Sequence, residues 1–331
     1  MGSFLSRSFN PETDVPELTG KVVLVSGGNS GVGFAVIQQL VRHGAKVYMG
    51  ARNERRAKAA IERLHAEGLG PGNGQVLWLK LDLSDPREAV KAAQKLMQEE
   101  ERLDVLVNNA AVLLVPFAKD RDGIQNIVMV NYIGTCVLTR ALLPLLKRTA
   151  EQPNSDVRIV TVNTVSHNAC PSNVRFRNLD NLNKDFEDTF FPQYNRYAFS
   201  KTMQLMFIKD LQQRLDEAGI PILCIALDPG EVRTEGVRAY TDSVGPIVGP
   251  IYRLIALLTF VTPAQGARST LFAAGSPIPR AEPNEYRGQY LTSSCKVANP
   301  SKLVQNAELR RELWGTTEKF LHDIGLDLPA I

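Results

Sequence analysis

The chain has 331 residues, of which 44% are hydrophobic and 22% charged, an ordinary globular composition that excludes a disordered chain. Its length allows two domains or one large α/β domain, and it is long enough to bury a core without disulfides or a metal. Lys and Arg total 38 against 35 for Asp and Glu, a formal net charge of +3. Because there is also no long basic run, we expect no binding to nucleic acid.

Cysteine and histidine are too scattered to form a metal or redox motif. The four cysteines stand far apart, at positions 136, 170, 224 and 295, and the four histidines are equally dispersed. We therefore expect buried, inert thiols in a reducing, cytoplasmic environment, and no bound metal.

The N-terminal arm and one apolar segment bear on membrane contact. The arm, residues 1–19, lacks the basic start and apolar run of a secretory signal, but Gly2 and Ser6 have the spacing of an acylation site, so acylation of Gly2 is left open. Residues 244–261 are strongly apolar, yet Arg253 and two prolines interrupt them, and the clean apolar stretch is too short to span a bilayer. We expect a buried or lid helix, with peripheral contact to a membrane surface as the alternative.

Strand-like and helix-like segments alternate along the chain. The strands are continuous apolar runs, which are typical of a parallel sheet covered by helices on both faces. Because neither a repeat nor a linker divides the chain, we predict one doubly wound α/β domain of the Rossmann type. The expected strands are 21–25, 46–51, 76–83, 103–111, 156–164 and 221–230, and the expected helices are 32–43, 53–67, 86–101, 123–149 and 195–218.

A glycine-rich segment, GGNSGVG, lies between the first strand and the first helix. Glycines permit a tight turn and a close approach of backbone to a phosphate, and the helix N-terminus offers free N–H groups and a favourable dipole. At the start of a βαβ unit, this cluster predicts a dinucleotide-binding loop. The residues expected to contact the cofactor here are Ser26, Gly27, Asn29, Ser30, Gly31, Val32 and Gly33.

The residue after the second strand indicates which dinucleotide binds. An acid at this point binds the ribose 2′-hydroxyl of NAD, whereas an arginine accommodates the 2′-phosphate of NADP. The second strand is followed by Arg52, with Arg55 and Arg56 close behind and no acid before Glu54. We therefore predict NADP(H), bound through Arg52, and interpret Arg55 and Arg56 mainly as a solvated helix face.

Tyr197 and Lys201 are four residues apart on an expected helix and therefore lie on the same face. A tyrosine hydroxyl has an ordinary pKa of about 10, and a nearby ammonium stabilises its ionised form. The pair is suited to exchanging a proton with a carbonyl or alcohol oxygen. A surface pair is the usual meaning of such a spacing, but behind a nucleotide loop and five βα units it indicates a catalytic pair.

These motifs, in this order, resemble the classical short-chain dehydrogenase/reductase family over about residues 18–300. The family's glycine motif is matched by residues 26–33, with Ser26 where the family usually has Thr. Its adenine-site aspartate is matched by Asp82, which Leu83 follows, so the resemblance implies that both contact the cofactor.

The resemblance continues in the later loops. The family's Asn-Asn-Ala-Gly motif is matched by residues 108–111, which implies cofactor contacts from Asn109 and Ala110. Its proline-glycine turn on the nicotinamide face is matched by residues 228–234, which implies contacts from Pro229, Gly230, Val232 and Thr234. The stretches RIVTVNTVSH, TPAQGARSTLFAA and GQYLTSS are similar to those of the retinol dehydrogenase-like and WW-domain oxidoreductase-like branch, which favours lipophilic alcohols, aldehydes and ketones.

The resemblance also implies the catalytic roles. Tyr197 exchanges a proton with the substrate oxygen, and Lys201 lowers the Tyr197 pKa and holds the ribose together with Tyr197. Asn131, in VNYIG, is expected to hold a water that links Lys201 to solvent.

Two positions depart from the family pattern. The substrate-orienting serine falls on Thr164, whose hydroxyl can donate and accept like a serine but whose methyl narrows the pocket. Ser166, two residues on, is the alternative if the loop is shifted. Ala111 replaces the usual glycine beside the cofactor.

The expected function is that of an NADP(H)-dependent carbonyl reductase or alcohol dehydrogenase acting on a small, apolar ketone, aldehyde or secondary alcohol. The alternative is an NADP(H)-binding protein without redox turnover, a scaffold, sensor or recruited cyclase. The family often forms homodimers through the helices that carry Asn131 and Tyr197, but a C-terminal extension could block that face, so pairing is left open. Beyond the basic domain we expect the arm 1–19, an insert 168–195, a substrate lid 231–262 and a C-terminal extension 296–331.

Overall fold

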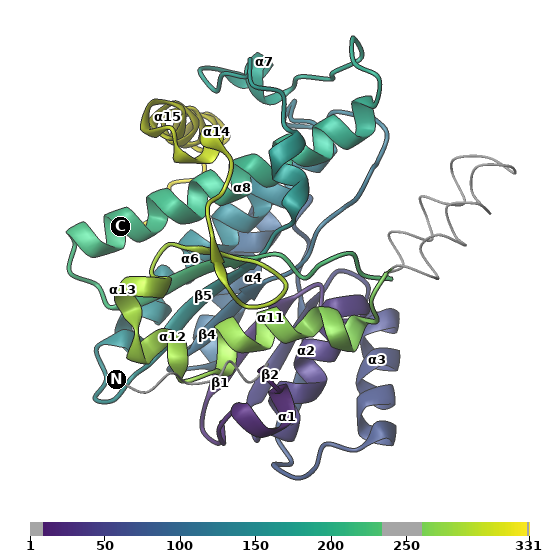
Figure 1. The fold of residues 1–331 in the computed structure, drawn as a ribbon, viewed down its shortest axis with the longest axis vertical. Helices are drawn as coiled ribbons and strands as arrows, with labels where there is room; N and C mark the ends of the chain where they lie inside the picture. The colour runs from purple at the N-terminus through teal and green to yellow at the C-terminus, as the bar shows by residue number, and fades with distance from the viewer. Residues whose placement is uncertain (1–8, 234–259, 330) are drawn as a thin grey trace, which may run out of the picture.

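The strands form where apolar residues are continuous, and every residue of β1 (Val22–Ser26) and β5 (Val157–Val162) is buried. In the computed structural model, residues 9–233, 260–329 and 331 are described, and they contain one eight-stranded sheet in the order β3-β2-β1-β4-β5-β6-β7-β8 (Figure 1). Adjacent strands are parallel, except that β8 is antiparallel to β7. The other strands are β2 (Lys46–Ala51), β3 (Gln75–Lys80), β4 (Val105–Asn108), β6 (Ile222–Leu227), β7 (Tyr290–Leu291) and β8 (Val297–Ala298).

Helices cover both faces of the sheet and enclose two apolar clusters. On one face, α2, α3 and α11 bury small and branched side chains, and α2 and α11 lie side by side (Figure 1). On the other face, α4, α6 and α8 enclose a second cluster that includes Tyr132 and Phe199. These helices are α2 (Gly31–Arg42), α3 (Glu54–Glu67), α4 (Pro86–Glu99), α6 (Gly134–Ala150), α8 (Pro192–Glu217) and α11 (Pro263–Gly275); shorter ones are α1 (Pro11–Asp14), α7 (Leu179–Leu182), α12 (Ile278–Ala281) and α13 (Pro283–Tyr286).

The doubly wound α/β fold predicted from the sequence is confirmed, and the differences lie at the ends of elements. The fourth and fifth strands stop at Asn108 and Val162, so Asn109 and Thr164 lie in the loops beyond the strands. The sheet also continues through β7 and β8, which the sequence did not indicate because each is only two residues long.

The expected helix 123–149 is a composite of three helical pieces. After α5 (Asn126–Val128), the π-helical turn η1 (Met129–Ile133) leads into α6. Asn131 lies in this π-turn, a type of distortion that is frequent at functional sites. The combined stretch Asn126–Ala150 is long and apolar enough to cross a membrane, but 89% of its apolar window is buried, as in the core helix of a globular domain.

The C-terminal extension packs onto the outer side of α6 and α8. After α14 (Lys302–Gln305), helix α15 (Ala307–Asp323) crosses α8 (Figure 1). The Trp314 ring stacks with Phe207 at 6.0 Å between centroids, and the guanidinium of Arg214 lies 3.9 Å from the Trp314 ring centre. Arg140 of α6 pairs with Glu318, and the Arg310 Nε donates to Asp210 at 3.1 Å. The extension therefore covers these two helices with both apolar and charged contacts.

The insert 168–195 contributes to the core and also to the surface. Phe176 and Phe186 are fully buried, each with its ring 5.4 Å from that of Phe199. Phe190 and Phe191, just before α8, are 88% and 59% exposed. Gly2 and most of the expected lid 231–262 lie outside the described residues.

Candidate active site

The glycine loop between β1 and α2 is shaped for a phosphate. Gly27 has φ +66°. A Cβ on Gly33 would lie 2.5 Å from the Gly27 carbonyl oxygen, so any side chain at Gly33 would clash with the backbone of the turn. Ser30 precedes α2, and its side chain makes no capping hydrogen bond. The first N–H groups of α2 are therefore left for an anion, which fits the pyrophosphate of a dinucleotide.

Ser26 and Asn109 join this loop to the loop after β4. The Ser26 hydroxyl accepts hydrogen bonds from the backbone N–H groups of Asn109 and Ala110, both at 3.0 Å. In return, the Asn109 amide donates to the Ser26 carbonyl at 2.9 Å. Because β1 and β4 are the strands at which the sheet order reverses, the two loops border the crevice where doubly wound sheets bind their ligands. Ser26 and Asn109 thus shape the crevice through backbone contacts.

Arg52 lies at the rim of the crevice, between the end of β2 and the start of α3. The Trp78 indole donates to the Ala51 carbonyl at 3.0 Å and fixes the end of the strand, and the Asn53 side chain caps α3 by accepting from the Arg56 N–H at 2.9 Å. Arg52 itself is exposed and makes no hydrogen bond or ion pair with the described residues. Its guanidinium is accordingly free to meet a phosphate beside the positive end of α3.

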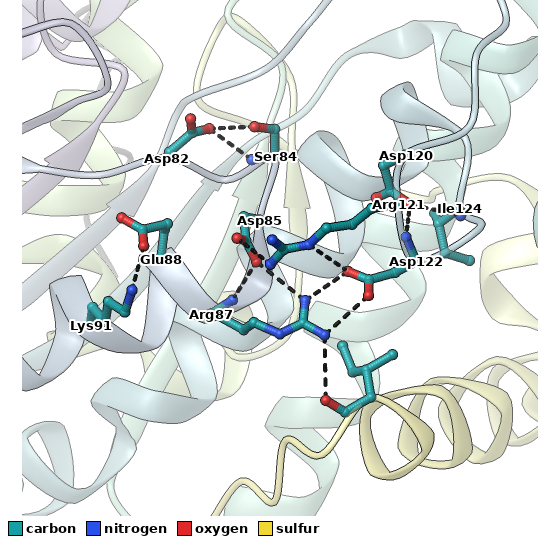
Figure 2. Close-up of polar contacts among 11 residues, drawn as sticks. Asp82, Ser84, Asp85, Arg87, Glu88, Lys91, Asp120, Arg121, Asp122 and Ile124 are labelled. Atoms are coloured by element: carbon teal, nitrogen blue, oxygen red, sulfur yellow. Dashed lines mark hydrogen bonds and ion pairs between the residues drawn. The ribbon is translucent and has the colours of Figure 1, made fainter.

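Asp82 is held in a short turn after β3, as Figure 2 shows. One of its carboxylate oxygens accepts from the N–H and the hydroxyl of Ser84, at 3.0 and 2.6 Å. Leu83 is buried beneath this turn. One carboxylate oxygen of Asp82 is thus hydrogen-bonded within the turn, while the other makes no hydrogen bond with the described residues.

The loop after β4 is anchored on its far side by a charged cluster. Arg87, in the first turn of α4, donates to both carboxylate oxygens of Asp122, at 2.7 and 3.0 Å (Figure 2). Its guanidinium also donates to the Ile324 carbonyl at 3.4 Å, just beyond α15. Arg121 bonds Asp85 at 2.6 Å. The loop that begins with Asn109 is therefore tied to α4 and to the C-terminal extension.

Tyr197 and Lys201 lie one turn apart on α8, as their spacing predicts. Tyr197 is half-buried, and its hydroxyl makes no hydrogen bond with the described residues. Burial, together with the carboxylates of Glu231 and Asp228, raises the pKa of Tyr197, the reverse of the lowering expected from Lys201. The hydroxyl therefore keeps its proton through the neutral range, as a proton donor must.

Lys201 is only 2% exposed, and burial lowers its pKa to about 7. Its ammonium group donates to the Val162 carbonyl at 3.0 Å and to the Gln204 side-chain oxygen at 3.1 Å. Both partners are neutral, which explains why burial dominates the pKa.

Asn131 is fully buried and holds the loop after β4. Its side-chain oxygen accepts from the Val112 N–H at 2.8 Å, and its amide donates to the Val112 carbonyl at 3.0 Å and to the Ser200 hydroxyl at 3.0 Å. The Asn131 carbonyl accepts from the Gln204 amide at 3.0 Å. Hydrogen bonds of the Gln204 side chain therefore join the Asn131 carbonyl to Lys201.

Thr164 and Ser166 share one turn beyond β5. The Thr164 hydroxyl accepts from the Ser166 N–H and donates to the Ser166 hydroxyl, both at 3.2 Å. Thr164 is half-buried, whereas Ser166 is 9% exposed and lies in the 3₁₀ turn η2 (Val165–Ala169). Thr164 is therefore the more accessible of the two residues.

His167 stabilises the same turn through a hydrogen bond to its backbone. Its Nδ1 donates to the Thr164 carbonyl at 2.7 Å, because a carbonyl only accepts, and burial lowers the His167 pKa so that the ring is neutral near pH 7. Its position in VNTVSH gave no independent signal of this role, since a lone buried histidine is common.

The turn after β6 closes the catalytic side of the crevice. Gly230 has φ +81°, and its N–H donates to the Asp228 carboxylate at 3.0 Å. Pro229 is half-buried, and Val232 forms a parallel bridge with Val261. Thr234 lies outside the described residues.

Like His167, Asn163 and Gln204 are residues of the site that the sequence did not single out. The Asn163 amide donates to the Lys201 carbonyl at 3.0 Å and to the Gln204 side-chain oxygen at 2.9 Å. The available signal was the spacing of Gln204, which follows Lys201 by three residues and so shares its helix face.

Comparison with known proteins agrees with this geometry. Residues 21–173 match the family model described as short chain dehydrogenase. The chain is 39% identical over 322 residues to a short-chain dehydrogenase/reductase of Armillaria gallica, covering 97% of this chain and 98% of that protein. The chain belongs to the short-chain dehydrogenase/reductase family.

Two further proteins are similar to this chain, one in sequence and one in structure. Human retinol dehydrogenase 14 is 33% identical, with 90% of this chain and 85% of that protein covered, which confirms the resemblance to the retinol dehydrogenase-like branch. The crystal structure of an uncharacterised protein from Mycobacterium paratuberculosis superposes with a TM-score of 0.70 at 25% identity, covering 98% of this chain and all of that chain. Other solved neighbours of this fold hold NADP or NAD.

Proposed function

We propose that this protein is an NADP(H)-dependent oxidoreductase that interconverts an apolar ketone or aldehyde and the corresponding alcohol. The observation that carries the proposal is the hydrogen-bond network that links Lys201, Thr164 and Asn131, with Tyr197 one turn from Lys201 on α8, in a sheet whose glycine loop leaves the start of α2 without a side-chain cap. The dinucleotide supplies or accepts the hydride when it is bound. The glycine loop would hold its pyrophosphate, Asp82 its adenine, and Lys201 and Tyr197 its ribose.

The chain's own residues handle the proton and the substrate oxygen. The Tyr197 hydroxyl, which keeps its proton near neutrality, donates it to the carbonyl oxygen during reduction. The Thr164 hydroxyl donates a hydrogen bond to the same oxygen and favours the developing alkoxide. For this it must turn from its present acceptor, the Ser166 hydroxyl.

The preference for NADP(H) is supported by the exposed Arg52 guanidinium and by the lack of an acid directly after β2. An apolar substrate is supported by Val165, 47% exposed directly after Thr164, and by the exposed Phe190 and Phe191 ahead of α8. The relative named retinol dehydrogenase 14 supports the same substrate class. A cytoplasmic location, with peripheral membrane contact as the alternative, remains a prediction from the sequence.

The experiment that tests the proposal measures NADPH oxidation by purified protein against a panel of aldehydes, ketones and quinones, with products identified by mass spectrometry. We expect turnover with lipophilic carbonyl compounds and formation of the matching alcohol. NADPH binding without turnover on any of them would contradict the proposal and favour a protein that binds the cofactor without redox chemistry.

We also infer that the protein is a monomer. The helices through which the family resemblance implies pairing are the ones that α15 covers, with Trp314 between Phe207 and Arg214. Light scattering during size-exclusion chromatography should give a mass near 36.5 kDa. A mass twice as large would show that pairing uses this or another face.

A further inference from the structure

The buried side chain of Gln204 makes hydrogen bonds to Lys201, Asn131 and Asn163 in the proposed active site. It is fully buried on α8, and its amide contacts three elements: its own helix, the π-turn η1 and the segment that follows β5. Every one of its partners carries or adjoins a residue of the site. A buried glutamine with such partners needs an explanation beyond packing.

The orientation of the Gln204 amide is fixed by its partners. Its oxygen faces the Lys201 ammonium at 3.1 Å and the Asn163 amide nitrogen at 2.9 Å, and both of these groups can only donate. Its nitrogen faces the Asn131 carbonyl at 3.0 Å, which can only accept. A reversed amide would place donors against donors. The Gln204 oxygen thus has both lone pairs engaged, and one of them is engaged by the catalytic ammonium.

The same network reaches Thr164. The Asn163 side-chain oxygen accepts from the Thr164 N–H at 2.9 Å, while the Asn163 amide donates to Gln204. One continuous chain of hydrogen bonds therefore joins the Asn131 carbonyl, Gln204 and Lys201, with Asn163 and Thr164 as a branch. Buried networks in which every member is satisfied hold one arrangement.

We propose that Gln204 is a positioning residue of the active site: its neutral amide holds the Lys201 ammonium and the Asn131 carbonyl at a fixed separation. This inference rests on the proposed function only for its catalytic consequence. The holding of the ammonium is a property of the folded chain and can be measured without a substrate.

The consequence for proton transfer follows from amide chemistry. An amide N–H neither gains nor loses a proton near neutrality, so this link orients Lys201 but does not carry its proton to the Asn131 side. The ammonium keeps one N–H beyond those that it gives to Val162 and Gln204. Titratable groups on the surrounding elements include Tyr197 on α8, Tyr132 on η1, His167 on η2, and Asp228 and Glu231 after β6.

The same helix provides a matched control. Gln212 lies two turns further along α8 and is 3% exposed. Its side-chain oxygen accepts from the Cys224 N–H at 2.7 Å, and its amide donates to the Ile222 carbonyl at 3.1 Å and to Asp216. Gln212 thus joins α8 to β6 without touching the site, and its replacement reports the cost of losing a buried glutamine.

The first experiment reads Lys201 directly, by NMR titration of protein carrying lysine labelled with ¹³C at Cε. The Lys201 signal is identified by its loss in Lys201→Met. In Gln204→Met the ammonium loses an acceptor, so its titration midpoint falls, and in Gln204→Glu it gains an opposite charge, so the midpoint rises by about one pH unit or more. In Gln212→Met it stays at the wild-type value. Equal midpoints in wild type and both Gln204 variants would overturn the proposal.

The second experiment adds kinetics with a carbonyl substrate that the panel identifies. Gln204→Met should lower kcat by about 10- to 100-fold, with the KM for NADPH nearly unchanged, because a displaced catalytic group costs rate more than binding. Gln212→Met should lower the melting temperature but keep kcat. If the wild type turns over no substrate, the proposed function fails while the titration still decides the role of Gln204. A Gln204→Met protein that unfolds is replaced by Gln204→Glu, which keeps the acceptor oxygen.

Discussion

The two sides of the crevice are built in opposite ways. On the cofactor side, two groups that would meet a dinucleotide make no side-chain contact with the described residues: Arg52 is exposed, and the start of α2 has no side-chain cap. On the catalytic side, Lys201, Asn131 and Gln204 are buried, and their polar groups are joined in one network. A ligand can complete the first side by binding, whereas the second side must already be arranged when the substrate arrives.

The replacement of Tyr197 by Phe tests the catalytic side most strongly. It removes only the hydroxyl that donates the proton, so kcat should fall by about 1,000-fold or more. NADPH affinity, measured by fluorescence titration, should stay close to wild type. A variant that keeps near-normal turnover would refute the role of Tyr197 as proton donor.

A methyl group on the glycine loop should be the most damaging change on the cofactor side. In Gly33→Ala the Cβ would lie 2.5 Å from the Gly27 carbonyl oxygen and 2.6 Å from the Asn109 amide, so the free energy of unfolding should fall by about 1–3 kcal/mol. NADPH affinity should fall by about 10-fold or more, because the displaced turn would no longer hold the pyrophosphate. A tenfold loss of affinity corresponds to about 1.4 kcal/mol of binding free energy. Chemical denaturation and fluorescence titration measure the two effects.

Gly315→Ala in α15 is the control for that change. A Cβ there meets nothing within 4 Å, so a gain of about 0.5–1 kcal/mol is expected from the better helix former. If both alanine variants behave alike, the glycine loop does not need the room that its geometry indicates.

Arg52→Ala sharpens the comparison, because an exposed side chain without protein partners should matter only to a ligand. NADPH affinity should fall by about 10- to 100-fold, while NADH affinity and the melting temperature stay unchanged. Arg55→Ala, in the first turn of α3 and on its solvated face, should have a smaller effect. Equal losses for the two cofactors would contradict the assignment of Arg52 to a 2′-phosphate.

The smallest expected effect belongs to Thr164→Ser. It keeps the hydroxyl and removes one methyl group, so kcat should change by less than about threefold, whereas Thr164→Ala should lose much more. Steady-state kinetics on both variants decide between Thr164 and Ser166. If Thr164→Ala is as active as wild type, Ser166 orients the substrate, or neither hydroxyl does.

The sequence was informative wherever a function needs a local pattern. The glycine loop, Arg52 and the Tyr197–Lys201 spacing each depend on neighbours within one or two helical turns, and the structure has the loop between β1 and α2 and the pair one turn apart on α8, as these patterns predict. The fifth strand was predicted to extend to Thr164, but it ends at Val162, where its pairing with β6 ends. The end of a strand depends on its partner strand, which the local sequence does not show.

The sequence was not informative where contacts join distant segments. Gln204 meets Asn131, 73 residues away, and no local pattern predicts such a pair. The strands β7 and β8 exist only because β6 offers an edge. Likewise, Cys136, Cys170 and Cys224 are buried as expected, but Cys295 in the turn after β7 is only half-buried.

The position of α15 also affects how the stability of the folded protein depends on its concentration. A surface covered by a second subunit is uncovered as the protein becomes scarce, so the stability of an obligate dimer depends on its concentration. Here the cover of α6 and α8 is a segment of the same chain, joined to the sheet through α14 and held by Trp314, Arg140 and Arg310. Its local concentration is therefore constant, and the folded state should persist equally well at nanomolar and millimolar amounts of protein.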